Sequence, residues 1–285
     1  FNSLSYFFFL PIVFSLYWLV NTKKLYQNII LLISSYIFYG CWDWRFLSLI
    51  FLSTLVDYYS GLNIYYNDYR KSKKLYLLIS LLFNLVLLGF FKYFNFFIDS
   101  WINLLFSFGY EYKSTWSLNI ILPVGISFYT FQTMSYTIDI YKGKLKPTRD
   151  FISFASFVSF FPQLVAGPIE RAANLLPQFY KKRTFYYNNA VDGMRQILWG
   201  LFKKIVIADN CAEYANLIFN NSTDYSGSTL VLGAIFFTFQ IYCDFSGYSD
   251  IAIGTSRLFG FNLKQNFAFP YFSRDIAEFW RRWHI

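Results

Sequence analysis

The residues whose types and spacing favour chemistry lie in the stretch from Gln240 to Ile285. Acids, bases and amides gather there among aromatic residues, and the stretch contains the single histidine of the sequence: Gln240, Asp244, Asp250, Asn266, Arg274, Glu278, Trp280, Arg281, Arg282 and His284. The apolar stretches elsewhere carry almost no charge. Because ionisable residues in a very apolar chain usually mark a functional site, we expect the site in this stretch.

The acids of this stretch follow an apolar run. Gln240 and Asp244 are four residues apart and share a helix face, which Gly247 extends, whereas Asp250 is expected beyond a break at Ser-Gly-Tyr. A carboxylate at membrane depth requires a partner. The candidate partners are Arg257, Arg274, Arg281 and Arg282. An ion pair that only joins two helices would explain either aspartate equally well.

A helix is predicted from Ser273, as its N-cap, to Ile285, with Asp275 in the first turn. On this helix we expect a Glu278–Arg282 pair, a Phe279–Trp283 contact, and a common face for Trp280, Arg281 and His284. The histidine is either a hydrogen-bonded anchor or a general base. A base must be neutral, and neighbouring arginines would lower its pKa.

The composition is that of a membrane protein. Of the 285 residues, 56% are hydrophobic, 14% charged and 25% aromatic. The net charge of +9 comes from short Lys and Arg clusters between apolar runs, which is typical of cytoplasmic loops and does not favour a nucleic-acid partner. The three cysteines, Cys41, Cys211 and Cys243, are scattered, so we expect no metal site and no bound cofactor.

Several apolar runs approach the roughly 20 residues that a helix needs to cross a bilayer. They are Leu4 to Val20, Leu25 to Gly40, Trp44 to Tyr59, Leu75 to Ile98, Leu118 to Tyr141 and Thr229 to Cys243. The first is expected to be a retained membrane helix, and Phe1 is not expected to be the native start. The predicted fold is an all-α polytopic membrane protein with roughly seven to nine transmembrane helices in one domain over residues 1–285.

Charged and near-neutral loops alternate along the first half of the chain. The positive loops carry Lys23 and Lys24, then Arg70, Lys71, Lys73 and Lys74, then Lys142, Lys144, Lys146 and Arg149. The others contain Asp43 with Arg45, and Glu111 with Lys113. Because positive loops stay in the cytoplasm, the N-terminus is predicted outside.

The alternation fails after the run from Phe151 to Ala166, since Lys181, Lys182 and Arg183 follow it. We expect a re-entrant segment there, with a motif made of Pro162, Gly167, Pro168, Glu170 and Arg171. An ordinary kinked span is the alternative. Asn189 to Asn210 is expected to be a basic amphipathic helix, lying in the interface or crossing at a slant, and Leu217 to Ser228 a polar loop.

Several segments together resemble the membrane-bound O-acyltransferases, in particular their alginate O-acetyltransferase branch. They are FNSLSYFFFLPIVFSLYW and SSYIFYGCWDWRF near the start, FFPQLVAGPIERAANLLPQF at 160–179, GLFKKIVIADN at 200–210, FQIYCDFSGYSDIAIG, and NFAFPYFSRDIAEFWRRWHI at the end. The resemblance runs through essentially the whole chain in order.

The resemblance implies a multi-pass inner-membrane enzyme with a tunnel, which moves an acyl group from a cytoplasmic thioester, acetyl-CoA or an acyl carrier, toward a polysaccharide hydroxyl. His284 matches the first of two family histidines, in a supporting role, and Gln240, Asp244, Asp250, Asn266, Trp280, Arg281 and Arg282 would line the polar end of the tunnel. The second histidine is expected beyond Ile285, so this chain is expected to be an N-terminal part that is inactive alone.

Three alternatives remain open at this point. The first is transfer of D-alanine or another acyl group to teichoic acid on the same fold. The second is relay of the acetyl group through an extracytoplasmic transferase partner. The third is a transporter or channel whose intramembrane acids form an ion path; it predicts discontinuous helices in two repeated halves, and the sequence has no such repeat.

Overall fold

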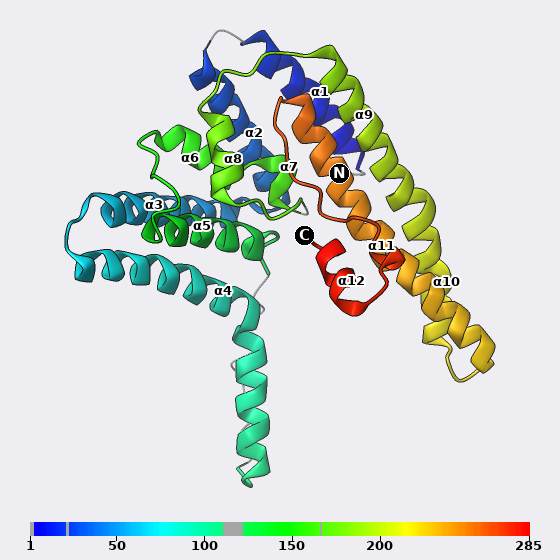
Figure 1. Cartoon of the computed structure of the whole chain (residues 1–285). Coiled ribbons are helices and arrows are strands. Elements are labelled where there is room, and N and C mark those ends of the chain that lie inside the picture. Colours follow the sequence, from blue (N-terminus) through cyan, green and yellow to red (C-terminus); the bar gives the residue numbers. More distant parts are fainter. Residues whose placement is uncertain (1–2, 21–22, 111–121, 166) are drawn as a thin grey trace. The chain divides into compact units, whose positions relative to one another are not determined.

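A computed structural model of the chain describes residues 3–20, 23–110, 122–165 and 167–285, and most of these residues are helical, with no strand among them. The elements, labelled in Figure 1, are α1 (Leu4–Leu19), α2 (Lys24–Asp43), η1 (Trp44–Phe46), α3 (Leu47–Tyr66), α4 (Arg70–Ser107), α5 (Ile126–Tyr141), α6 (Phe151–Val158), α7 (Phe161–Leu164), α8 (Ala172–Phe179), α9 (Tyr187–Leu201), η2 (Phe202–Ala208), α10 (Asp209–Asn220), α11 (Gly227–Leu258), η3 (Pro270–Phe272) and α12 (Ile276–Arg282). The predicted all-α membrane fold is confirmed.

Two compact units divide the chain. The first, called unit 1, comprises Phe1–Ser34, Phe160–Glu170 and Pro177–Ile285, and the second, unit 2, comprises Ser35–Ser159 and Arg171–Leu176. Each is described here by itself. All of the candidate site stretch from Gln240 to Ile285 belongs to unit 1.

In unit 2, a buried polar cluster connects α3, α4 and α5. The Asp57 carboxylate is inaccessible and accepts hydrogen bonds from the Ser80 hydroxyl (2.5 Å) and the Asn84 amide (2.8 and 3.0 Å). Ser80 also bonds to Thr137 of α5 at 3.0 Å. Because lipid offers no hydrogen-bond partners, such a cluster favours association of the three helices over their separation.

Unit 1 is built on the contact between α11 and the continuous helical stretch α9–η2–α10, which run side by side in Figure 1. Glycines permit a very close approach at two points. A Cβ on Gly254 would lie 2.5 Å from the Gly193 carbonyl oxygen, and one on Gly247 would lie 2.8 Å from the Gly200 oxygen. In each helix the two glycines are seven residues apart, which is two turns, so they lie on one face.

Three helical stretches among the described residues are long and apolar enough to cross a membrane: Lys24–Tyr66, Arg70–Ser107 and Gly227–Leu258. The stretches Leu4–Leu19 and Phe151–Leu164 are apolar but shorter. The predicted helices at the first four apolar runs are confirmed, although the clusters at Arg70 and Lys74 begin α4 instead of forming a loop. The total of seven to nine crossings stays a prediction.

The middle of the chain departs from the expected boundaries. Residues 118–121 of the fifth apolar run, and Glu111 and Lys113 of the loop before it, lie outside the described residues. The helix of that run, α5, begins only at Ile126, after Gly125 in the left-handed conformation (φ 76°). Only half of the predicted loop from Leu217 to Ser228 is a loop, residues 221–226, because α10 continues to Asn220 and α11 starts at Gly227.

The run from Phe151 is not one straight helix, as its prolines predicted. α6 ends at Val158 after 8 residues, and α7 covers only the 4 residues Phe161–Leu164. Pro162 lies at the start of α7, where its missing N–H breaks no helical bond. Ala166 lies outside the described residues, and the re-entrant path itself stays a prediction.

Candidate functional site

The predicted break at Ser246-Gly247-Tyr248 is wrong, because α11 is continuous from Gly227 to Leu258. Gly247 instead serves close packing, since any side chain there would meet the backbone of Gly200 and Lys204. Asp244 and Asp250 therefore lie on one uninterrupted helix, and their side chains are directed by its contact with α9 and η2.

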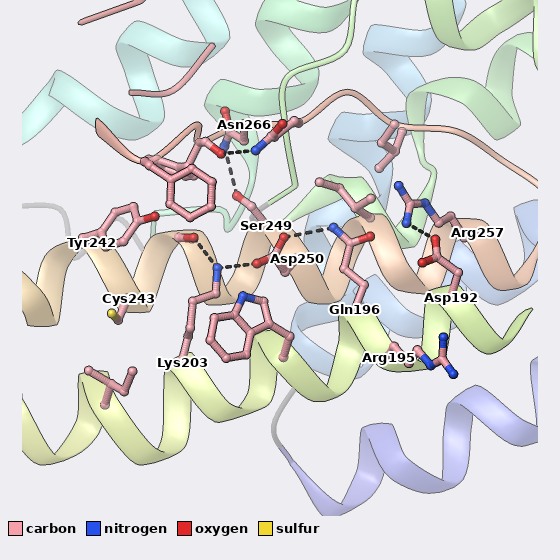
Figure 2. Close-up of a pocket in the computed structure, with 18 residues that line it drawn as sticks. Asp192, Arg195, Gln196, Lys203, Tyr242, Cys243, Ser249, Asp250, Arg257 and Asn266 are labelled. Atoms are coloured by element: carbon pink, nitrogen blue, oxygen red, sulfur yellow. Dashed lines mark hydrogen bonds and ion pairs between the residues drawn. The ribbon is translucent and has the colours of Figure 1, made fainter. Parts of the chain in front are cut away.

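Lys203 of the π-helical stretch η2 is the cation that Asp250 contacts. Its side chain is buried, with the residue 6% exposed, and its ammonium group donates to the Ser246 hydroxyl and the Asp250 carboxylate (Figure 2). The Gln196 amide donates to the other Asp250 oxygen at 3.0 Å. Gln196 and Lys203 are seven residues apart, so this spacing on a basic amphipathic helix was the signal that could have revealed them.

The expected arginine partners of the two aspartates are wrong. Asp244 pairs with Lys204 at 2.7 Å, and Arg257 pairs with Asp192. Two other candidate partners, Arg274 and Arg282, both pair with Glu278 of the C-terminal segment. The reason is geometric: η2 runs along α11, so its two lysines, Lys203 and Lys204, lie beside the acids of α11.

A pocket of about 640 Å³ opens between α9, η2, α11 and the segment 263–269. Figure 2 shows the residues that line it: Asp192, Arg195, Gln196, Trp199, Lys203, Ile207, Tyr242, Cys243, Ser246, Ser249, Asp250, Ile253, Arg257, Leu263, Gln265, Asn266, Phe267 and Phe269. Two of the residues predicted for a tunnel, Asp250 and Asn266, are among them. The other five do not line this pocket, and their place in a tunnel stays a prediction: Gln240, Asp244, Trp280, Arg281 and Arg282.

Two polar groups of the pocket wall keep hydrogen-bonding capacity for a ligand. The buried Gln196 Oε1 has no hydrogen-bond partner among the described residues. The Lys203 ammonium has three donors, and Ser246 and Asp250 are its two hydrogen-bond acceptors in the described part of the chain. A donor and an acceptor together fit a ligand that carries both, such as an amide.

His284 is connected to this pocket by its contact with Asn266, a residue of the pocket wall. The His284 Nδ1 and Asn266 Oδ1 atoms are 2.9 Å apart, and the Asn266 amide donates to Ser249 at 3.0 Å. Asn266 is 1% exposed, and its backbone carbonyl oxygen accepts a hydrogen bond from the Ile285 N–H at 3.0 Å. Its side chain and its backbone are therefore both held in place. Since an amide oxygen only accepts, Nδ1 carries the proton and Nε2 is left as an acceptor.

The surroundings of His284 are aromatic. Its ring packs edge-on against Phe245 (centroids 5.0 Å apart) and is stacked near Phe267 (6.4 Å). Partial burial lowers the pKa of the imidazole, so the neutral form predominates at neutral pH; burial, and not the neighbouring arginines as expected, is the cause.

The C-terminal helix is shorter than predicted. α12 begins at Ile276 with Asp275, not Ser273, as its N-cap, because the Asp275 side chain accepts from the Glu278 N–H (2.7 Å). It ends at Arg282, where Trp283 becomes extended and pairs with Phe267. His284 follows in a left-handed conformation (φ 53°), and therefore does not share a helix face with Trp280 and Arg281.

Two contacts predicted for the C-terminal helix are confirmed, the Glu278–Arg282 ion pair and the stacked rings of Phe279 and Trp283, 5.6 Å apart. The backbone N–H and side chain of Arg274, with the Arg282 side chain, lower the pKa of Glu278 to about 2. Glu278 therefore stays ionised throughout the physiological range.

The residues of the predicted re-entrant motif are mostly buried. Pro162 and Pro168 are buried, and a Cβ on Gly167 would lie 2.6 Å from the Cα of Gln163. Glu170 is 2% exposed and accepts a hydrogen bond from the backbone N–H of Lys264, whereas Arg171 is exposed.

Arg183, one of the three positive charges that follow the run from Phe151, is buried. It is 5% exposed, and its guanidinium lies 4.9 Å from the Phe261 ring and donates to the Tyr17 hydroxyl (2.7 Å) and the Asn28 side chain (2.6 Å). Lys181 and Lys182 are exposed. The positive charge available for orienting this loop is therefore two lysines.

No group of three or more His, Cys, Asp or Glu side chains placed to hold a metal ion occurs in residues 3–20, 23–110, 122–165 and 167–285.

Comparison with known proteins gives several close relatives, although no family model matches the chain. A probable alginate O-acetylase of Pseudomonas putida is 43% identical over the whole chain, which spans 58% of that relative. A peptidoglycan O-acetyltransferase of Helicobacter pylori is 37% identical over the whole chain, which spans 59% of it. A teichoic acid D-alanyltransferase of Bacillus subtilis is 29% identical over 59% of the chain.

The apolar helices and these relatives define a multi-pass membrane protein, and the chain belongs to the membrane-bound O-acyltransferase family. The chain spans just over half the length of the curated alginate O-acetylases that it matches, 58% of the Pseudomonas putida protein and 56% of the one from Azotobacter vinelandii.

Proposed function

We propose that this chain carries part of the site of an O-acetyltransferase that moves acetyl from a cytoplasmic thioester toward hydroxyls of an extracytoplasmic polysaccharide. The observation that carries the proposal is the position of the His284 imidazole, whose Nδ1 lies 2.9 Å from the Oδ1 atom of Asn266 on the wall of the pocket. The names of the relatives, which act on alginate and on peptidoglycan, support acetyl as the group transferred.

In this proposal the acceptor hydroxyl oxygen attacks the thioester carbonyl carbon, the carbon–sulfur bond breaks, and the sulfur leaves as a thiol. The hydroxyl proton is taken by a neutral histidine, which then gives it to the leaving sulfur. We assign His284 Nε2 to orient the acceptor hydroxyl, with the second histidine of the family as the base. Asn266 fixes the His284 tautomer, because its amide oxygen accepts from Nδ1.

We assign the pocket to the donor, acetyl-CoA or an acyl carrier. The donor and acceptor left by Lys203 and Gln196 fit the amide groups of the arm that bears the thioester. The Lys203 ammonium would also favour an anionic donor. Gln240, Asp244, Trp280, Arg281 and Arg282 are proposed for the part of the tunnel beyond this pocket.

The test uses the full-length protein in a cell that acetylates its polymer. His284→Gln and Asn266→Ala should each lower polymer O-acetylation at least tenfold, because each breaks the Nδ1 contact. Cys211→Ala, on α10 and outside the pocket lining, is the control and should leave acetylation unchanged. Unaltered acetylation in both site variants would remove this assignment.

A second candidate function is D-alanyl transfer to teichoic acid, which the similarity to teichoic acid D-alanyltransferases supports more weakly. The two are separated by supplying labelled acetyl and labelled D-alanine donors to membranes that contain the full-length protein. Incorporation of D-alanine without acetyl would favour this second candidate.

We propose that the protein lies in the cytoplasmic membrane. Residues 1–285 would form one domain within the lipid bilayer, and the N-terminus would lie outside. Transfer through a second, extracytoplasmic transferase as partner fits the same orientation. The test introduces Lys182→Cys in a background with Cys41, Cys211 and Cys243 changed to Ala. An impermeant thiol reagent should react with the introduced thiol only when it is added on the cytoplasmic side. Labelling from the outside would contradict the re-entrant path.

A further inference from the structure

The segment from Phe259 to Phe267 connects α11 with Asn266, and it is held by side chains from other parts of unit 1. Tyr17 donates to the Phe259 carbonyl at 2.9 Å, and the Gln178 side chain bonds to both the carbonyl (2.9 Å) and the N–H (2.8 Å) of Asn262. Glu170 accepts from the N–H of Lys264. The segment has no regular secondary structure, so these contacts take the place of helical hydrogen bonds.

Glu170 is the anchor nearest the site. Lys264 and Asn266 are two residues apart, a distance of about 7 Å along an extended chain, so a shift of the backbone at Lys264 is passed directly to Asn266. The amide of Asn266 must lie within about 3 Å of both Ser249 and His284 to keep its two hydrogen bonds. Few displacements of Lys264 satisfy both conditions.

The burial of Glu170 requires an explanation. It is 2% exposed in a segment whose other members are mainly apolar, and a buried acid costs free energy unless its oxygens are hydrogen-bonded. An apolar residue would fill the same space without that cost. Among its contacts, the carboxylate supplies an acceptor for a backbone N–H at the step of the chain that leads to Asn266.

We propose that Glu170 is a positioning residue that, through the Lys264 N–H, keeps Asn266 within hydrogen-bonding distance of His284. The contact itself does not depend on the proposed function, whereas its importance for catalysis does. This gives the glutamate of the predicted re-entrant motif a role at the site, although Glu170 and His284 are 114 residues apart in the sequence.

The first test reads His284 directly. The chain has a single histidine, so its ¹⁵N-labelled imidazole gives an unambiguous NMR signal in lipid nanodiscs. In the wild-type chain we expect the Nδ1–H tautomer. Glu170→Ala and Asn266→Ala should each replace it with a mixture of tautomers, whereas Glu170→Gln should retain it because the amide oxygen still accepts from Lys264. Glu213→Ala, at an exposed site on α10, is the matched control.

If Glu170→Ala does not fold, Glu170→Asp is used, because its shorter side chain retracts the acceptor by one methylene. It should shift the tautomer ratio in the same direction. A wild-type tautomer in folded Glu170→Ala or Glu170→Asp, alongside a changed tautomer in Asn266→Ala, would overturn the proposal. Glu170 would then stabilise the fold without positioning the histidine.

The second test measures activity in the full-length protein. Glu170→Ala should lower kcat about tenfold or more with little change in KM, and Glu170→Gln should restore most of it. The proposed function of the site and the positioning role of Glu170 can fail separately, and the two tests distinguish these failures. If His284→Gln retains full activity, the proposed function of the site fails while the tautomer result stands, whereas an unchanged tautomer rejects the Glu170 proposal alone.

Discussion

The closest approach between α9 and α11 yields the most quantitative prediction, for Gly254→Ala. The added Cβ would lie 2.5 Å from the Gly193 oxygen and 2.9 Å from the Ile197 nitrogen. These are backbone atoms, so no side-chain rotation relieves the overlap, and an ordinary contact of 3.4 Å requires the helices to separate by about 0.9 Å.

Such a separation has two consequences. Overpacking of this kind costs about 1–3 kcal/mol, while replacing a helical glycine by alanine gains up to about 1 kcal/mol, so we expect a net loss of about 1–2 kcal/mol in stability. The Gln196–Asp250 hydrogen bond, 3.0 Å long and one turn away, would lengthen beyond hydrogen-bonding range. The Lys203 contact should loosen with it.

The assay is unfolding of the purified chain by denaturant in detergent micelles, followed by helical circular dichroism. Gly89→Ala is the matched control, because Gly89 is also helical and a Cβ there meets nothing within 4 Å. Gly89→Ala should be neutral or slightly more stable than the wild type. The reasoning is refuted if Gly254→Ala is as stable as Gly89→Ala.

Four further predictions follow from the ionisable groups. Lys203→Met leaves Asp250 without its cation and should cost up to about 3 kcal/mol, since the Asp250 side chain is 18% exposed; the double variant with Asp250→Asn should recover part of this in the same unfolding assay, and no recovery would contradict a buried ion pair. Burial lowers the pKa of His284, so its contribution to stability is complete above the unfolded value of about 6.5 and falls as the pH drops through the folded pKa; an NMR titration midpoint above 6.5 would be inconsistent with this. The pKa of Glu278 is about 2, so its contribution is complete above about 4.3 and is lost as the pH falls toward 2; a ¹³C carboxyl titration near 4.3 would disprove the arginine contacts. Arg183→Lys cannot reproduce the forked contacts with Tyr17 and Asn28 and should lower the unfolding midpoint more than Lys182→Arg at the exposed neighbouring site; equal midpoints would show that the fork is unimportant.

The pattern of apolar residues predicted most helices correctly, because helix formation in lipid depends on local composition and on backbone hydrogen bonds within one segment. The helices from Leu4 to Ser107 begin and end within a few residues of the expected positions, with two exceptions: α3 continues to Tyr66 instead of Tyr59, and α4 starts earlier and ends later. The break after Val158 was likewise signalled by local proline chemistry. What failed was the reading of Gly247 as a break, since glycine in a membrane helix is as often a contact point.

Residue types alone singled out two residues of the pocket wall, Asp250 and Asn266, but not the partners that these residues contact. The sequence by itself determined that a helical membrane protein concentrates its acids, amides and one histidine near its end, and this clustering drew attention to Asp250, Asn266 and His284. Only the tertiary structure decided that Asp250 contacts Lys203, 47 residues away, and that Glu170 reaches the backbone beside Asn266. The physical reason is that periodicity fixes which face of a helix a residue occupies, whereas the partner of that face depends on which helices the glycines allow to approach.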